Sequence, residues 1–296
     1  MKLAMWALPA SAIAIAILFI PQVLNVQSLF ADVDSTFVDL GFWTLVGLAF
    51  VIAASGFFSG LSGFGFSAIG AFTLWLLPPM KAIPLLMALS TVNQLMSMHE
   101  LRSQFDIQEF TSSTGSIPYI IGGIIGIPAG LWVLTSLDAA IVSALFGAIL
   151  ISYSLWTMVK PVQLIKFKQS PLRSAFIGGL GGVIGGFTAF PGCVVVIWSG
   201  LVGKDKAEQR TVVQPFILSM QLISLISLAA YSPEKFDLEF FILFLPLVAI
   251  ALPFTKFGVA VFHRISDANF KQATQGLLLV SGAALLAKLK PLILVW

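Results

Sequence analysis

Charged residues are scarce in this sequence. Asp, Glu, Lys and Arg together make up 10% of its 296 residues, whereas 58% are hydrophobic, and the mean hydropathy is +1.00. Soluble domains are about 25% charged, so this composition excludes a soluble globular protein. The apolar runs are long, and the short alternating segments typical of a transmembrane β-barrel are lacking. We therefore expect an all-α polytopic membrane protein.

Cysteine and histidine are almost absent as well. The one cysteine, Cys193, cannot form an intrachain disulfide, and His99 and His263 belong to no Cys/His cluster, so we expect neither a metal nor a cofactor. There is no nucleotide-binding motif and no soluble basic domain for nucleic acid. Acidic residues are rare in the apolar runs, which argues against an intramembrane enzyme and predicts no catalytic residues.

The first apolar run is Met5–Leu24, and it follows Lys2. Because no small-x-small cleavage site ends it, we interpret it as an extra N-terminal transmembrane helix rather than a signal peptide. Residues 1–40 then comprise this helix and an acidic loop. A loop without Lys or Arg is typical of the outer side of the membrane.

Two similar halves follow, at residues 41–160 and 174–296, with a linker at 161–173. Each begins with an apolar segment interrupted by glycines, at Ser62–Phe66 and at Gly181–Gly192, and continues with three apolar runs. These runs are Ala82–Met98, Ser116–Thr135 and Ala139–Val159 in the first half, and Thr211–Ala230, Leu238–Phe262 and Phe270–Leu289 in the second.

The loop between the halves sets the orientation. It holds the densest cationic cluster, and cations collect on the cytoplasmic side of the cytoplasmic (inner) membrane. Counting spans from this loop places the N-terminus in the cytoplasm, the C-terminus outside, and the halves in opposite orientations. The sequence therefore predicts an inverted repeat, each half a broken or re-entrant helical hairpin plus three transmembrane helices. The cluster is Lys160, Lys166, Lys168 and Arg173.

Short residue matches in a common order support a duplication. Thr91–Gln94 is similar to Thr211–Gln214, and Lys81 and Lys206 each precede an alanine. Each match alone is weak, but their shared order favours two related halves.

The two breaks are the candidate binding site. Irregular backbone at membrane depth occurs only where protein buries it or where it lines a cavity, and paired breaks mark the site in inverted-repeat transporters. Helix N-termini there would direct N–H groups at an anion. The competing interpretation, close packing through glycine, is favoured for Gly122, Gly126 and Gly130. The candidate residues are Ser62, Gly63, Phe64, Gly65, Phe187, Thr188, Phe190, Pro191 and Gly192.

Four amides lie deep in the apolar runs: Asn93, Gln94, Gln214 and Gln221. They would donate hydrogen bonds to substrate oxygens, and Gln94 and Gln214 occupy equivalent positions in the two halves. The alternative is that they join helices, at about 0.6 kcal/mol for each bond.

Cations near the span ends could attract an anion. Lys256 lies within an apolar run, and Arg102 follows another. Snorkelling toward the headgroups accounts equally for Lys256, and anchoring at the cytoplasmic surface accounts for Arg102 and Arg210.

Three motifs stand in a fixed order along the chain. They are Ser62-Gly63-Phe64-Gly65, then Pro78-Pro79-x-Lys81-Ala82, and a glycine-rich stretch that ends in Pro191-Gly192. In this order the chain resembles the TauE/SafE family of sulfite and organosulfonate exporters, from about Gly41 to Leu289. It departs from that family at Phe66, where a further glycine is common.

The resemblance implies a secondary transporter that moves a small sulfur-containing anion, such as sulfite or sulfoacetate, by alternating access. The partners implied are a proton or Na+ as the coupling ion and the lipid bilayer around the protein. An oligomer is compatible with the resemblance. The alternatives are an anion channel and a transporter of another small solute, with an intramembrane enzyme less favoured.

Replacement of Gln94 or Gln214 by leucine tests the paired amides. We expect each variant to fold and to bind the transported anion more weakly, because a donor to its oxygens is lost. Affinity measured on the purified protein checks this, and unchanged affinity in both variants would refute the paired role.

Overall fold

The computed structural model describes residues 40–102, 107–113, 115–136, 144, 147–148, 150–152, 154–155, 170–188 and 190–287. All regular structure in these ranges is helical, which confirms the all-α prediction. The expected N-terminal helix lies outside these residues. The expected span at 139–159 and the linker at 161–173 lie largely outside them.

The described part of the first half begins with a long helix and a short one. α3 (Phe42–Ser62) is followed by α4 (Gly65–Gly70) and the 3-10 helix η2 (Ala71–Trp75). Proline at the first position then opens α5 (Pro79–Glu100), where a missing N–H costs nothing. The remaining helices are α6 (Ile107–Thr111) and α7 (Ser116–Ser136).

The second half also begins with a long helix and a shorter one. α9 (Pro171–Thr188) is followed by the shorter α10 (Gly192–Leu201). A capping box, in which Asp205 and Glu208 bond each other's backbone N–H groups, starts α11 (Lys206–Tyr231). The described part of this half ends with η3 (Pro233–Phe236), α12 (Leu238–Arg264) and α13 (Asp267–Ala287).

Several of these helices suit a bilayer. By length and composition, three helices of the described residues can cross a membrane: Phe42–Ser62, Lys206–Ala230 and Leu238–Arg264. The segments Gly65–Trp75, Ser116–Gly130 and Gly192–Leu201 are apolar but shorter. The chain is therefore a membrane protein that combines long helices with half-length ones.

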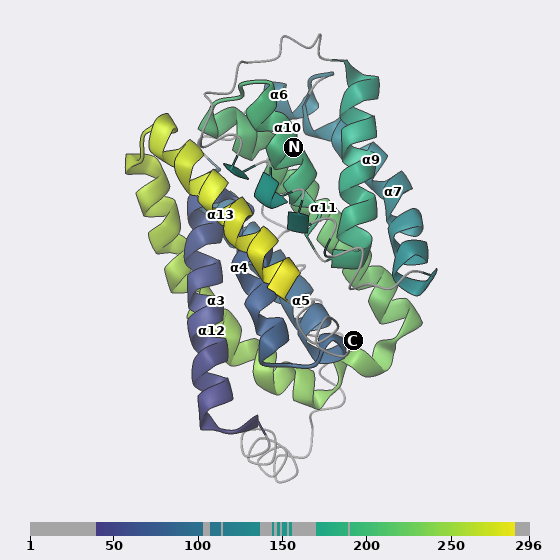
Figure 1. Ribbon diagram of the computed structural model, residues 1–296, viewed down its shortest axis with the longest axis vertical. Coiled ribbons are helices and arrows are strands. Elements are labelled where there is room, and N and C mark those ends of the chain that lie inside the picture. The colour runs from purple at the N-terminus through teal and green to yellow at the C-terminus, as the bar shows by residue number, and fades with distance from the viewer. Residues whose placement is uncertain are drawn as a thin grey trace.

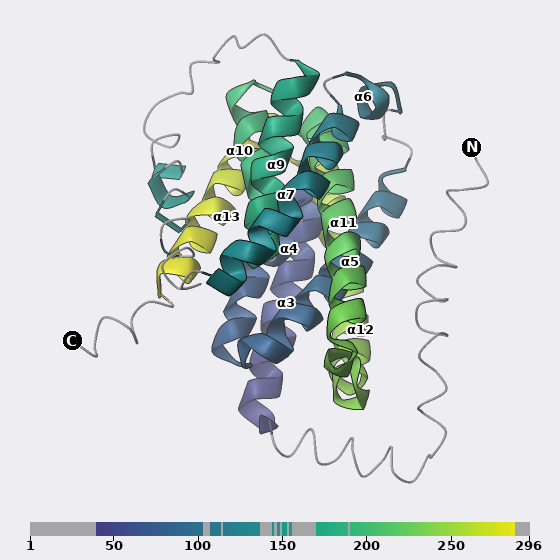
Figure 2. The same ribbon diagram turned by 90° about the vertical axis from the view of Figure 1, so that its right-hand side faces the viewer.

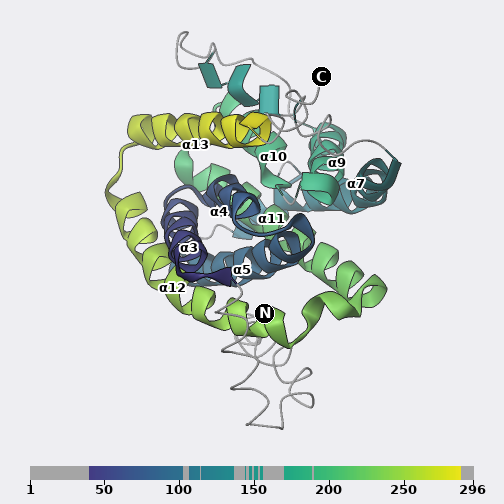
Figure 3. The ribbon, with the colours of Figure 1, turned by 60° about the horizontal axis from the view of Figure 1, so that its bottom comes forward.

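Two helix pairs flank the molecule. α3 packs along α12, and α7 packs along α9 (Figure 1). Between these pairs lie α5 and α11, which contact each other (Figure 3). α5 also packs on α12, and α11 on α7, so each central helix belongs to one flanking pair.

Glycine sets the close approach of α3 and α12. A Cβ at Gly60 would lie 3.0 Å from the Cα of Gly258, and one at Gly56 would lie 2.6 Å from the carbonyl oxygen of Ala251. Small residues let membrane helices approach to backbone contact, where van der Waals packing replaces the missing hydrophobic driving force.

Glycine has the same role between α7 and α9, which lie side by side in Figure 2. A Cβ at Gly126 would overlap the carbonyl of Gly179, and one at Gly186 would lie 3.1 Å from the Cα of Gly130. A Cβ at Gly122 would overlap the carbonyl of Ala175. The packing interpretation of the glycines in α7 is confirmed.

Replacement of Gly258 by alanine tests this packing. The new Cβ would overlap the carbonyl oxygen of Phe57 in α3, so we expect the free energy of unfolding to fall by about 1–3 kcal/mol. Gly276→Ala is the matched control, because no described heavy atom lies within 4 Å of that position. Its change should stay within about 1 kcal/mol. Thermal unfolding of the purified variants checks the difference, and equal losses would contradict it.

Candidate functional site

The first break lies where the sequence predicts it. α3 ends at Ser62, and Gly63 takes the left-handed conformation at φ 84°, with its N–H bonded to the carbonyl of Ser59. Glycine adopts a positive φ without the clash that a Cβ would cause. The helical path resumes at Gly65, so the interruption lasts two residues.

Ser62 joins the two helices across this break. Its hydroxyl donates to the carbonyl of Phe58 at 2.7 Å and accepts the N–H of Gly65 at 3.0 Å. The N–H of Phe64 lies 3.4 Å from the same oxygen. One buried side chain thus satisfies backbone groups at the end of α3 and at the start of α4.

The second break is shorter than predicted. α9 remains helical to Thr188, so the predicted start of the interruption at Gly181 is wrong. The reason is packing, because a Cβ at Gly181 would lie 2.9 Å from Phe216 and one at Gly185 would lie 2.6 Å from Pro191. These glycines serve helix contacts rather than a break. The second break therefore falls between the end of α9 at Thr188 and the start of α10 at Gly192.

Phe187 and Thr188 form the last turn of α9. Their side chains lie outside the described part of the structure, so their expected contact with an anion stays a prediction.

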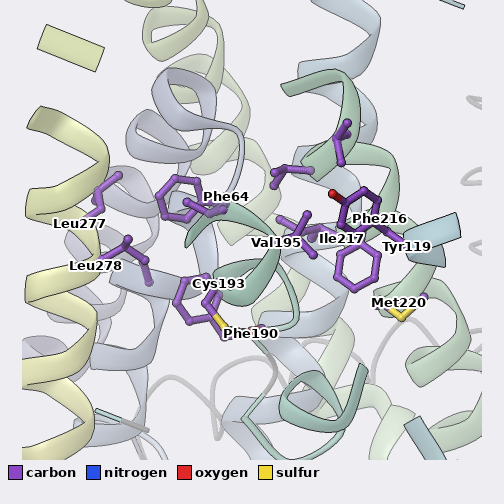
Figure 4. Packing of buried hydrophobic residues seen from close by; sticks show 14 of the residues in the cluster. Phe64, Tyr119, Phe190, Cys193, Val195, Phe216, Ile217, Met220, Leu277 and Leu278 are labelled. Atoms are coloured by element: carbon purple, nitrogen blue, oxygen red, sulfur yellow. Dashed lines mark hydrogen bonds between the residues drawn. The ribbon is translucent and has the colours of Figure 1, made fainter. Parts of the chain in front are cut away.

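The two breaks meet inside the protein. The rings of Phe64 and Phe190 stack with centroids 6.3 Å apart. A Cβ at Gly192 would lie 3.7 Å from the Cβ of Phe64. Figure 4 shows Phe64, Phe190 and Cys193 close together within one buried cluster. The N-termini of α4 and α10 are therefore neighbours.

The candidate glutamines also meet at the first break. Gln94, on α5, donates its amide to the carbonyl of Gly63 at 2.7 Å. Gln214, on α11, donates to Ser97 at 2.9 Å and lies 3.5 Å from the amide oxygen of Gln94. Both side chains are buried. The structure brings this predicted pair together beside Gly63.

Asn93 lies apart from this pair, although it precedes Gln94 in the chain. Its oxygen accepts a hydrogen bond from Thr255 of α12, and its buried nitrogen has no partner among the described residues. Asn93 therefore joins α5 to α12, in agreement with the interhelical alternative.

Arg210 is the residue that the sequence interpretation missed. Its side chain is only 4% exposed, so anchoring at the membrane surface is wrong. It donates to the carbonyl of Gly60 and to the hydroxyl of Ser97, both at 2.8 Å, and lies 4.2 Å over the ring of Phe262. Arg210 lies four residues before Gln214, which places both side chains on the same face of α11. This spacing was the signal in the sequence that Arg210 belongs with the candidate glutamine.

The two expected cations do not join the buried group. The Lys256 side chain is 58% exposed and lies 3.6 Å from the carboxylate of Glu100. Arg102 is exposed and bonds to His99 at 2.8 Å. Both lie at the surface, as the snorkelling and anchoring interpretations require.

The remaining chemistry of the site is limited. Within the described ranges, no three His, Cys, Asp or Glu residues gather as metal ligands. Cys193 is buried, and its thiol lies 3.1 Å from the carbonyl of Phe190. The arrangement provides hydrogen-bond donors, two helix N-termini and one buried guanidinium.

Comparison with known proteins identifies the kind of chain. The family model described as sulfite exporter TauE/SafE matches residues 48–285. This range includes both breaks, the paired glutamines and Arg210. No curated protein and no solved structure gave a match.

Replacement of Ser62 by alanine tests the structure of the first break. The backbone N–H of Gly65 would lose its acceptor in a buried position, so we expect a loss of about 1 kcal/mol in the free energy of unfolding. Ser67→Ala, in the following turn, is the control. Thermal unfolding checks both variants, and a stable Ser62→Ala protein would refute the capping role.

Proposed function

The chain belongs to the TauE/SafE family of sulfite exporters, and we propose that it is a secondary transporter of a small sulfur-containing anion. Sulfite, or an organosulfonate such as sulfoacetate, would cross the cytoplasmic membrane by alternating access. The anion would be held where the two helix breaks meet.

The adjacent N-termini of α4 and α10 carry this proposal. A helix N-terminus has roughly half a unit of positive charge and unpaired N–H groups. Phe64, the residue before α4, contacts Gly192, the first residue of α10. Two like partial charges held together repel each other in a medium of low dielectric constant. An anion beside them would reduce this repulsion and accept those N–H groups that Ser62 does not already bond.

The polar groups beside the breaks suit a sulfur oxyanion. Gln94, Gln214 and Arg210 provide N–H donors at Gly63. Among the described residues, the ion pairs engage Lys81, Lys204 and Lys256, and none of them includes Gln94, Gln214 or Arg210. A carboxylate would compete with the anion for these donors.

The helix pairs support an inverted repeat. If α3, α5 and the first break correspond to α9, α11 and the second break, α12 corresponds to α7. The contacts of α3 and α5 with α12 then match those of α9 and α11 with α7. Two bundles of three helices would rock against each other at the contact between α5 and α11. With the cationic loop between the halves in the cytoplasm, this repeat would place the N-terminus in the cytoplasm and the C-terminus outside.

Transport in proteoliposomes tests the proposal. The full-length protein is given sulfite, sulfate, thiosulfate, sulfoacetate, taurine and chloride, each with and without a pH gradient or a Na+ gradient. We expect saturable transport of one or more of the sulfur anions. A response to one gradient would identify the coupling ion.

Two results would count against the proposal. Folded protein that moves none of the sulfur anions would refute sulfur-anion transport. A non-saturating conductance without coupling would indicate a channel in its place.

A further inference from the structure

Arg210 is a buried cation without a carboxylate partner among the described residues. The ion pairs there join Lys81 to Glu239, Lys204 to Glu109 and Lys256 to Glu100. Removing an ion from water costs several kcal/mol even after relaxation. A guanidinium at 4% exposure therefore requires compensation from nearby negative charge.

The partners of Arg210 supply part of this compensation. The carbonyls of Gly60 and Leu61, at 2.8 and 3.4 Å, belong to the last turn of α3, which has the negative end of the helix dipole. Ser97 adds a neutral hydroxyl, and Phe262 adds the face of its ring. All four partners are formally uncharged, so none of them neutralises the positive charge of the guanidinium.

One donor of the guanidinium is unused. The Nε–H of Arg210 is buried and has no hydrogen-bond partner among the described residues. A Cβ at Gly63 would lie 3.4 Å from this nitrogen and 3.1 Å from Cγ of Gln214. The free donor therefore lies beside the residue at which α3 breaks, where glycine has no side chain to cover it.

We propose that Arg210 binds the transported anion, with Nε–H donating to one of its oxygens beside Gly63. This assignment rests on the proposed transport of a sulfur oxyanion and names the residue that supplies its counter-charge. Sulfite and sulfonates have several oxygens on one sulfur, which matches the planar array of donors of an arginine. Gly63 precedes Phe64, whose Cβ would lie 3.7 Å from a Cβ at Gly192, the first residue of α10.

The alternative is that Arg210 only caps α3. A cap contributes to stability whether or not an anion is present, whereas a binding residue changes how the protein responds to the anion. Substitutions that separate these two effects distinguish the roles.

The experiment uses the full-length protein, with sulfite as the probe, and three variants. Arg210→Gln removes the charge, and Arg210→Lys keeps the charge but loses the Nε–H. Arg264→Gln is the matched control, because that arginine is exposed at the end of α12. For each protein we would measure the sulfite KM in proteoliposomes and the rise in Tm that sulfite causes in detergent.

We expect Arg210→Gln to raise the sulfite KM by at least about tenfold, as loss of a charged hydrogen bond predicts, and to abolish the sulfite-dependent rise in Tm. Arg210→Lys should raise KM by about fivefold or more, because the lysine ammonium cannot reproduce the planar donors. Arg264→Gln should behave as the original protein does in both measurements.

The outcomes separate this inference from the proposed function. Folded Arg210 variants with the original KM and the original rise in Tm would overturn the inference alone. If Arg210→Gln does not fold, the sulfite KM and the rise in Tm of Arg210→Lys test the inference. If neither variant folds, Arg210 is a structural cap of α3 and the inference is overturned. No transport and no rise in Tm with any sulfur anion in the unchanged protein would refute the proposed function itself.

Discussion

The need to satisfy backbone groups inside a membrane governs the centre of this structure. An unpaired carbonyl or N–H in hydrocarbon costs several kcal/mol, so a helix that stops there requires side chains at its end. At the first break these are Ser62 for an N–H of α4, Gln94 for the carbonyl of Gly63, and Arg210 for that of Gly60. Polar residues from α3, α5 and α11 therefore converge on one point.

Close packing through glycine positions this convergence. α3 reaches α12, and α9 reaches α7, at backbone contact through Gly60 and Gly182 and their partners. Glycine in a helix is unfavourable by about 1 kcal/mol relative to alanine in water, but here it permits contacts that hold the broken helices in place. The same residue type has a second role at Gly63, where φ is positive. Glycine-rich sequence thus indicates either packing or a break, according to its setting.

This double role explains which features could be predicted. The apolar runs predicted the helices, because a long run of hydrophobic residues in a bilayer can adopt few structures other than a helix. The break at Ser62–Phe66 was found, but the second was extended to Gly181, since glycines of a packed helix look the same as glycines of a break. The burial of Arg210 was missed because it depends on Gly60, 150 residues earlier in the chain. The spacing of four residues from Gln214 indicates only a shared helix face, and no local pattern around residue 210 contains the contact with Gly60.

Arg210 also makes the two halves chemically unequal. In the register that aligns Thr91–Gln94 with Thr211–Gln214, Ser90 stands where α11 has Arg210. Ser90 accepts a hydrogen bond from Gln221 at 2.6 Å, a neutral link between α5 and α11. In a repeat of this kind each half would have its own glutamine, Gln94 or Gln214, whereas only the second half would have the cation, Arg210. An anion at the junction would then be attracted toward the first break, where α11 contacts α3, and it would bind the same guanidinium that donates to the end of α3. Anion binding and the contact between the two bundles would depend on the same side chain.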